Sequence, residues 1–246
     1  MRRNIARQRN SGRVRDLGPV APQKLHDRIE VVYEDPDLIV IEKAAGVISY
    51  PVDPREKNSA IQLVRQYWRV TGKENEHLYL LHRLDQQTSG LLVFAKTTMA
   101  RHSLSMQFEQ HTIIREYLAV TSGIPSRKQG VFRTFLGRDS RGKRSVESRG
   151  KQAVTHIEVV AENASLNRAL VRCRLDTGRT HQIRIHLAHL HTPVLGDSVY
   201  GKHPADRLAL HAAVLGFIHP RTKAPVVLRS SLPQSVKSLF HAAEKS

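Results

Sequence analysis

The stretch "HRLDQQTSGLLVFAK", residues 82–96, joins an expected core strand to charged side chains at its entrance. Residues 91–95 form a short apolar run, which is typical of a buried strand. Arg83 and Asp85 flank Leu84 just before that run, and a Thr-Ser-Gly turn lies between. Charges beside a core strand are costly to bury unless they are paired. The two charges are therefore either a structural ion pair or part of a reactive site.

The spacing of these charges says how they point. In an extended segment, residues two apart face the same side, so Arg83 and Asp85 project together while Leu84 faces the core. An aspartate fixed beside arginines stays ionised and is held still, as a nucleophile or a base must be. Spacing alone leaves both interpretations open.

The net charge indicates the class of partner. The 246 residues contain 39 Lys and Arg against 22 Asp and Glu, which gives a formal charge of +17. Such an excess favours a polyanion, either nucleic acid or an acidic membrane surface. No strongly amphipathic basic helix is apparent, so nucleic acid is the preferred partner. A basic protein without such a partner is the alternative.

Cysteine content and hydropathy bear on location. Cys173 is the single cysteine, so no disulfide can form within the chain. The chain has no apolar run of about 18 residues and no apolar signal-peptide core. A reducing, cytoplasmic location fits this composition best.

The composition divides the chain into a tail and one folded domain. Residues 1–28 are dominated by arginine and have too few apolar residues for a core, which predicts a disordered tail. This tail either lies along phosphates or is solvated without a role. Residues 29–246 are expected to form a single domain.

Within that domain, strands and helices mix without a βαβ rhythm or a fixed repeat. This pattern predicts an α+β fold with a mostly antiparallel sheet. Residues 126–151, rich in Arg, Lys, Gly and Ser, are predicted to form a long basic loop or a mobile hairpin. Strands are expected at 29–33, 38–42, 116–120, 153–163, 167–176, 210–220 and 224–228, and helices at 59–70, 97–110, 180–190 and 233–245.

Several kinds of site can be set aside. His181, His186, His189 and His191 cluster in the sequence, but their spacing does not put three ligands on one helix face, and no HExxH pattern occurs. We therefore expect no metal site. The order His-Arg-Leu-Asp differs from the His-Arg-Asp-Leu of a kinase catalytic loop, and no GxSxG serine elbow is present.

Two further segments contain residues suited to RNA chemistry. "LDTGRTHQIRIH", residues 175–186, places Arg179 before a helix start and Arg184 in its first turn. A helix N-terminus with arginines suits a phosphate or an aspartate partner. Tyr117 lies in the expected strand "IIREYLAV"; such a tyrosine is usually packed, but it can also stack on an unstacked uracil.

Together these segments resemble the RluA-type family of RNA pseudouridine synthases, over roughly residues 30–230. Four motifs of the family occur in the expected order and with the expected spacing. In the first motif, Ala44 occupies the position where proline is usual. The four motifs are "IEKAAGV" (41–47), "HRLDQQTSGLLVFAK" (82–96), "REYLAVTSG" (115–123) and "LDTGRTHQIRIHLAHLHTPVLGDSVYG" (175–201).

The resemblance implies a reaction and roles for the site residues. Enzymes of this family break the N1–C1′ bond of uridine, turn the uracil and attach it to C1′ again through C5. They use no metal, nucleotide or redox cofactor. Asp85 is then the essential carboxylate, acting as nucleophile or as base. Arg184 keeps Asp85 ionised, Tyr117 lies against the target uracil, Arg83 fills the gap left by the flipped nucleotide, and Arg179 contacts RNA.

The resemblance also implies a pseudouridine-synthase fold with a central RNA-binding cleft. The tail is too short for a separate N-terminal RNA-binding domain, and a monomer is expected. Large-subunit ribosomal RNA is the favoured substrate over tRNA. The alternatives are a non-catalytic RNA-binding factor of ribosome assembly and a basic nucleic-acid hydrolase, which would need metal ligands or a paired acid and base.

Overall fold

The computed structural model describes residues 15–16, 23–51, 53, 56, 58–72 and 77–241. Its strands are β1 (Arg15–Asp16), β2 (Gln23–His26), β3 (Ile29–Glu34), β4 (Leu38–Lys43), β5 (Tyr79–Leu80), β6 (Ser89–Ala95), β7 (Ile114–Ser122), β8 (Gln129–Arg138), β9 (Arg144–Val146), β10 (Lys151–Asn163), β11 (Arg168–Leu175), β12 (Leu210–Ile218) and β13 (Pro225–Arg229). Its helices are α1 (Ala60–Val70), α2 (Thr98–Glu109), α3 (Gln182–His189) and α4 (Gln234–His241).

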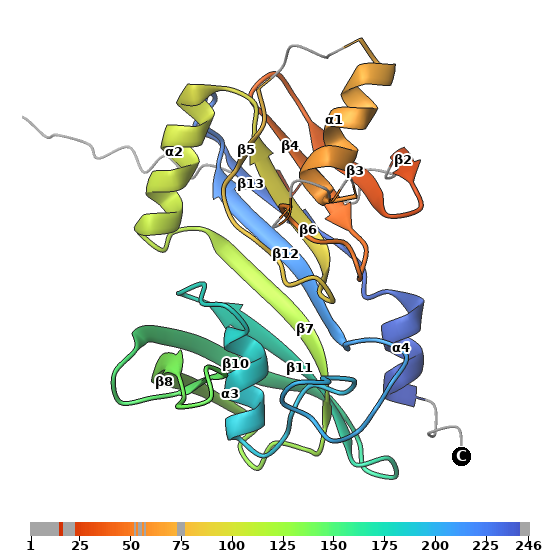
Figure 1. Ribbon diagram of the computed structural model, residues 1–246, viewed down its shortest axis with the longest axis vertical. Helices are drawn as coiled ribbons and strands as arrows, with labels where there is room; N and C mark the ends of the chain where they lie inside the picture. Colours follow the sequence, from red (N-terminus) through yellow and green to blue (C-terminus); the bar gives the residue numbers. More distant parts are fainter. Residues whose placement is uncertain are drawn as a thin grey trace, which may run out of the picture.

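The strands form one sheet whose main path runs β2-β3-β4-β6-β12-β7-β11-β10-β8-β9. All pairs are antiparallel except β6 with β12 and β1 with β13. In Figure 1, α1 and α2 lie with the half of the sheet that contains β4 and β6, and α3 lies with the half that contains β8 and β10. β7 and β12 run side by side between the two halves. The predicted α+β fold with a mostly antiparallel sheet is confirmed.

Strand β6 is buried along its whole length between β4 and β12. Leu92 packs in the apolar cluster that contains Trp68 of α1. Leu91, on the opposite face, packs in the cluster that contains Leu104 of α2. A strand covered on both faces has a continuous apolar run rather than alternation, which explains the pattern of residues 91–95.

The β6–β12 contact leaves no space for a side chain at Gly90. Gly90 pairs with Ala212, and its φ is +116°. A Cβ placed on Gly90 would lie 2.3 Å from the carbonyl oxygen of Ala212 and 2.6 Å from its nitrogen. The glycine of the Thr-Ser-Gly turn is thus required by the backbone of a neighbouring strand.

The structure differs from the sequence expectations at the start of the fold. β2 pairs with β3 and β1 pairs with β13, so strand pairing begins within residues 1–28, before the expected start of the fold. Residues 1–14 and 17–22 of this predicted tail lie outside the described residues, and their disorder stays a prediction. Residues 126–151 are predicted to form either a long loop or a hairpin, and in the structure β8 and β9 form a hairpin there. The last residues of the expected C-terminal helix also lie outside the described part.

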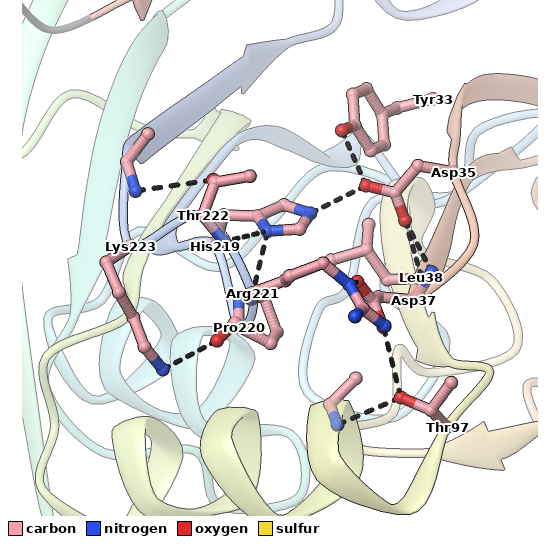
Figure 2. Close-up of polar contacts among 12 residues, drawn as sticks. Tyr33, Asp35, Asp37, Leu38, Thr97, His219, Pro220, Arg221, Thr222 and Lys223 are labelled. Atoms are coloured by element: carbon pink, nitrogen blue, oxygen red, sulfur yellow. Dashed lines mark hydrogen bonds and ion pairs between the residues drawn. The ribbon is translucent and has the colours of Figure 1, made fainter.

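A polar network joins the β3–β4 turn to the β12–β13 turn (Figure 2). Asp37 accepts two hydrogen bonds from the guanidinium group of Arg221, at 2.6 and 2.7 Å. Asp35 Oδ2 accepts from Tyr33 at 2.7 Å and lies 2.6 Å from His219 Nε2. Charge-assisted bonds of this kind fix the two turns relative to each other, at a distance in sequence of more than 180 residues.

Candidate active site

A cleft of about 760 Å³ brings together all the residues that the sequence predicts for the site. Its lining comes from the segment before β6, from β7 and from the start of α3. The predicted residues that line it are Arg83, Asp85, Tyr117, Arg179 and Arg184.

Two acidic side chains share the guanidinium group of Arg184. Arg184 Nη1 donates to Asp85 Oδ2 at 3.3 Å, while its Nε and Nη2 donate to Asp197 at 2.7 and 2.8 Å. Asp197 is fully buried, and Asp85 keeps part of its side chain exposed to the cleft. Burial alone would lower the pKa of Arg184, but the hydrogen bonds and the negative charge of Asp197 raise it above the usual arginine value. Arg184 is thus a fixed cation whose remaining N–H points at the exposed carboxylate.

Arg83 forms no ion pair with Asp85 in the described part of the chain. Its side chain is exposed at the cleft, whereas Leu84 between them is buried. The two charges therefore have separate surroundings. The interpretation as a structural ion pair between Arg83 and Asp85, which spacing alone left open, is wrong.

The segment that holds Asp85 is fixed by residues 43–49. Ser49 Oγ donates to the carbonyl oxygen of Leu84 at 2.9 Å and accepts from the Leu84 N–H at 3.0 Å. The backbone N–H of Gly46 donates to the carbonyl oxygen of Gln86 at 2.8 Å. Bonds on both sides of Asp85 limit the movement of its backbone.

Lys43 lies at the centre of this attachment and is fully buried. Its Nζ donates to the carbonyl oxygens of Ala44, Val47 and Gln86 at 3.0, 2.7 and 3.2 Å. Burial lowers the pKa of Lys43 to about 7, although the negative charge of Asp85 opposes the shift. A buried ammonium group thus joins the first motif to the segment around Asp85.

The lowered pKa of Lys43 predicts a pH dependence of stability. Between pH 7 and the ordinary lysine value near 10.5, the unfolded chain binds more protons than the folded one, so the free energy of unfolding rises with pH. From pH 7 to pH 9 this lysine alone contributes a rise of about 2 kcal/mol. Urea denaturation at both pH values measures it. Lys43→Met is expected to lack this rise; an equal rise in both proteins would contradict the prediction.

Tyr117 lies on β7, and its side chain packs in the apolar cluster that contains Trp68. Only 8% of the residue is exposed, yet it lines the cleft. Burial raises the pKa of Tyr117, and the charge of Arg115 opposes this. The phenol is therefore neutral at physiological pH, and it presents an apolar ring beside Asp85.

Arg115 lies two residues before Tyr117 and is also buried at the cleft. Its Nη2 donates to the carbonyl oxygen of Asp176 at 3.1 Å, and its guanidinium group lies 5.6 Å from the ring centre of Phe108. Its Nε has no partner among the described residues. This cation adds to the positive field around the place where a substrate would lie.

The opposite wall of the cleft is made by the turn that leads into α3. Arg179 lines this wall, and its Nε donates to the carbonyl oxygen of Gln152 at 3.0 Å. His181 adopts a left-handed φ of +59°, which brings its Nε2 to 3.9 Å from Asp85 Oδ2. Its Nδ1 lies 3.0 Å from the hydroxyl group of Tyr200, whose ring faces the Arg184 guanidinium at 5.3 Å.

Sequence reasoning did not single out Lys43, Asp197 or Tyr200 as site residues. Asp197 and Tyr200 lie inside the quoted segment 175–201, and Lys43 lies inside "IEKAAGV". The only local sequence signal for Lys43 is its position at the end of β4, two residues after the apolar run of residues 38–41. Their importance follows from contacts across the fold.

Among the described residues, one group of three possible metal ligands lies within 4.8 Å: Asp35, Asp37 and His219. It belongs to the network between two turns, where hydrogen-bond donors already occupy the carboxylate oxygens (Figure 2). His186, from the histidine cluster, lies instead between two threonine hydroxyl groups at 2.8 and 2.9 Å.

None of the described helices combines the length and the apolar character that a membrane span requires.

Sequence comparison places this chain among enzymes of known type. The family model described as RNA pseudouridylate synthase matches residues 37–189. An RNA pseudouridine synthase of Bacillus subtilis, itself uncharacterized, is 37% identical over 87% of this chain and 72% of its own length. Ribosomal large subunit pseudouridine synthase D of Zymomonas mobilis is 38% identical over 86% of this chain and 72% of its own length.

Solved structures with the same fold point in the same direction. Human RNA pseudouridylate synthase domain containing 1 matches with a TM-score of 0.68 and 25% identity, over 87% of this chain and 94% of that one. Human RNA pseudouridylate synthase domain containing 4 matches with a TM-score of 0.71 and 24% identity, over 86% and 91%. The latter likeness bears on the fold alone.

Proposed function

The chain belongs to the RluA-type family of RNA pseudouridine synthases and is an isomerase that acts on RNA, and from this membership we propose that Asp85 is its essential carboxylate. The observation that supports this most is the arrangement of charge around Arg184. Asp197 holds the guanidinium group through two short bonds, and Asp85 presents its carboxylate to the cleft beside it. Asp85 is thus oriented and partly exposed, as a reacting group must be.

The remaining cleft residues suit the isomerisation of uridine. In this reaction the N1–C1′ bond breaks and a C5–C1′ bond forms, while the C5 proton leaves and N1 gains a proton. Asp85 acts at the sugar or the base, either by attack or by removal of a sugar proton. Tyr117 stacks on the target uracil, and Arg184 stabilises the carboxylate. The neutral phenol of Tyr117 keeps this wall free of negative charge.

The substrate is a uridine of large-subunit ribosomal RNA. Curated relatives from several bacteria, at 34–38% identity, are named for the large ribosomal subunit, which supports this choice over tRNA. Incubation of the purified protein with transcribed large-subunit ribosomal RNA and with pooled tRNA transcripts tests it. Pseudouridine is expected in the ribosomal RNA; formation in tRNA alone would exclude the proposed target.

Arg83 enters the RNA stack in place of the flipped nucleotide. Arg83→Ala is expected to lower kcat/KM about ten-fold or more, because the flipped state loses the group that fills its gap. Since the side chain is exposed, the free energy of unfolding should change by less than about 0.5 kcal/mol. Arg69→Ala, an exposed arginine of α1 outside the cleft, is the control. An unchanged kcat/KM for the Arg83 variant would remove this role.

A further inference from the structure

A second cavity, of about 550 Å³, opens beside the catalytic cleft. We call it the side pocket. It is built from the segment before α1, from α1 and β5 and from the start of α2. Tyr50, Leu80 and Arg83 line both cavities, so the two adjoin at these residues. The residues that line the side pocket alone are Pro51, Ile61, Arg65, Leu78, Tyr79 and Arg101.

The charge of the side pocket is strongly positive. Arg65, Arg83 and Arg101 line it, and none of its lining residues in the described part of the chain is acidic. All three side chains are exposed. In the described part of the chain, none of these guanidinium groups makes an ion pair or a hydrogen bond. Unpaired arginines around a concave surface favour phosphate groups.

The walls of the side pocket suit a planar base. Tyr50 is 53% exposed, so its ring is available for contact from solvent. The ring of Tyr79 lies 5.0 Å from the Arg101 guanidinium and stacks on His77 at 5.9 Å. The lining residues between the aromatic and charged groups, such as Ile61, are apolar. Aromatic faces with adjacent arginines are the usual surroundings of an unstacked base in single-stranded RNA.

The position of the side pocket next to the cleft indicates which part of the RNA reaches it. Arg83 stands where the two cavities meet, and in the proposed function it replaces the uridine that moves to Asp85. A neighbouring nucleotide of the same strand must then pass the mouth of the side pocket. We propose that the side pocket binds an unstacked nucleotide next to the target uridine, and so selects the sequence around it. This inference rests on the proposed function.

The first test removes one base at a time from the RNA. The probe is a short hairpin around the uridine that the purified protein modifies, with an abasic nucleotide placed at each flanking position in turn. One of these RNAs is expected to lose about ten-fold in kcat/KM with wild-type protein, the scale of one base–aromatic stack. Tyr79→Leu should lose a similar factor on the intact hairpin.

The combination of the two changes decides the result. If the base and Tyr79 are partners, Tyr79→Leu should lose little more on the critical abasic RNA. Factors that multiply, or flanking abasic RNAs that are all modified like the intact hairpin, would overturn the proposal. If wild-type protein modifies neither ribosomal RNA nor tRNA, the proposed function itself fails and the side pocket proposal with it.

The arginines provide a test that does not alter a strand. The double variant Arg65→Gln/Arg101→Gln should reduce the slope of log affinity against log salt by about 1.4, for two contacts to a single strand. Arg69→Gln, on the same helix as Arg65 but outside both cavities, is the matched control and should leave the slope unchanged. Equal slopes for the double variant and the control would contradict phosphate binding here.

Discussion

Asp85→Asn is expected to abolish pseudouridine formation while the fold and the affinity for RNA stay nearly unchanged. Asparagine has the same shape but can act neither as a nucleophile nor as a base. We expect kcat to fall about a thousand-fold or more, as for other groups that react directly with substrate. Multiple-turnover assays on the unmodified substrate RNA, with pseudouridine separated from uridine by nucleoside chromatography, measure this fall.

The ion pairs explain why this substitution should spare the fold. Arg184 keeps its two short bonds to Asp197, and it loses only the charge of a partner at 3.3 Å. The Tm and the dissociation constant for RNA should therefore resemble those of the wild type. Asp206→Asn, at an exposed acid outside the cleft, is the control. More than about a tenth of the wild-type kcat in the Asp85 variant would exclude the proposed role.

Gly90→Ala is expected to have the largest effect on stability. Its new methyl group would meet the backbone of Ala212 at 2.3 to 2.8 Å, in a position where φ is already +116°. Backbone atoms of a paired strand cannot turn away as a flexible side chain can. The free energy of unfolding should therefore fall by at least about 4 kcal/mol, because overpacking and backbone strain add.

A matched glycine separates these two causes. Gly142 also has a positive φ, of +76°, but a Cβ placed on it would have nothing within 4 Å. Gly142→Ala should lose only about 1 to 2 kcal/mol, from strain alone. Urea denaturation of both variants measures the difference. A Gly90 variant as stable as the Gly142 variant would show that β6 and β12 can separate without cost.

Much of the fold could be predicted because local patterns reflect burial. Residues 91–95 match the last five residues of β6, and residues 59–70 match α1 with its N-cap at Ser59. The hairpin of β8 and β9 was harder, because Val131 and Phe135 are exposed and arginines and glycines interrupt the alternation. Strand β8 depends on pairing with β10, and β9 in turn pairs with β8, which sequence spacing does not reveal.

The candidate site was predictable only where motifs mark it. Asp85 and Arg184 lie in segments with a recognisable order of residues, and the structure brings them to 3.3 Å. Asp197 was missed because its importance depends on its burial against Arg184. Lys43 was missed because the carbonyl oxygens that surround its ammonium group include that of Gln86, 43 residues away. Tertiary contacts of this kind produce no periodic pattern in the sequence.

The strand order also sets when the protein can become active during its synthesis. β12 lies between β6 and β7, although it follows both in the chain by many residues. Local hairpins such as β3–β4 and β10–β11 can form early, since short loops close quickly. Asp85 and Arg184 are 99 residues apart in the sequence. They are held next to each other only after β12, residues 210–218, has left the ribosome and joined β6 to β7. We therefore expect a nascent chain to gain the ability to modify RNA only after β12 has emerged from the ribosome.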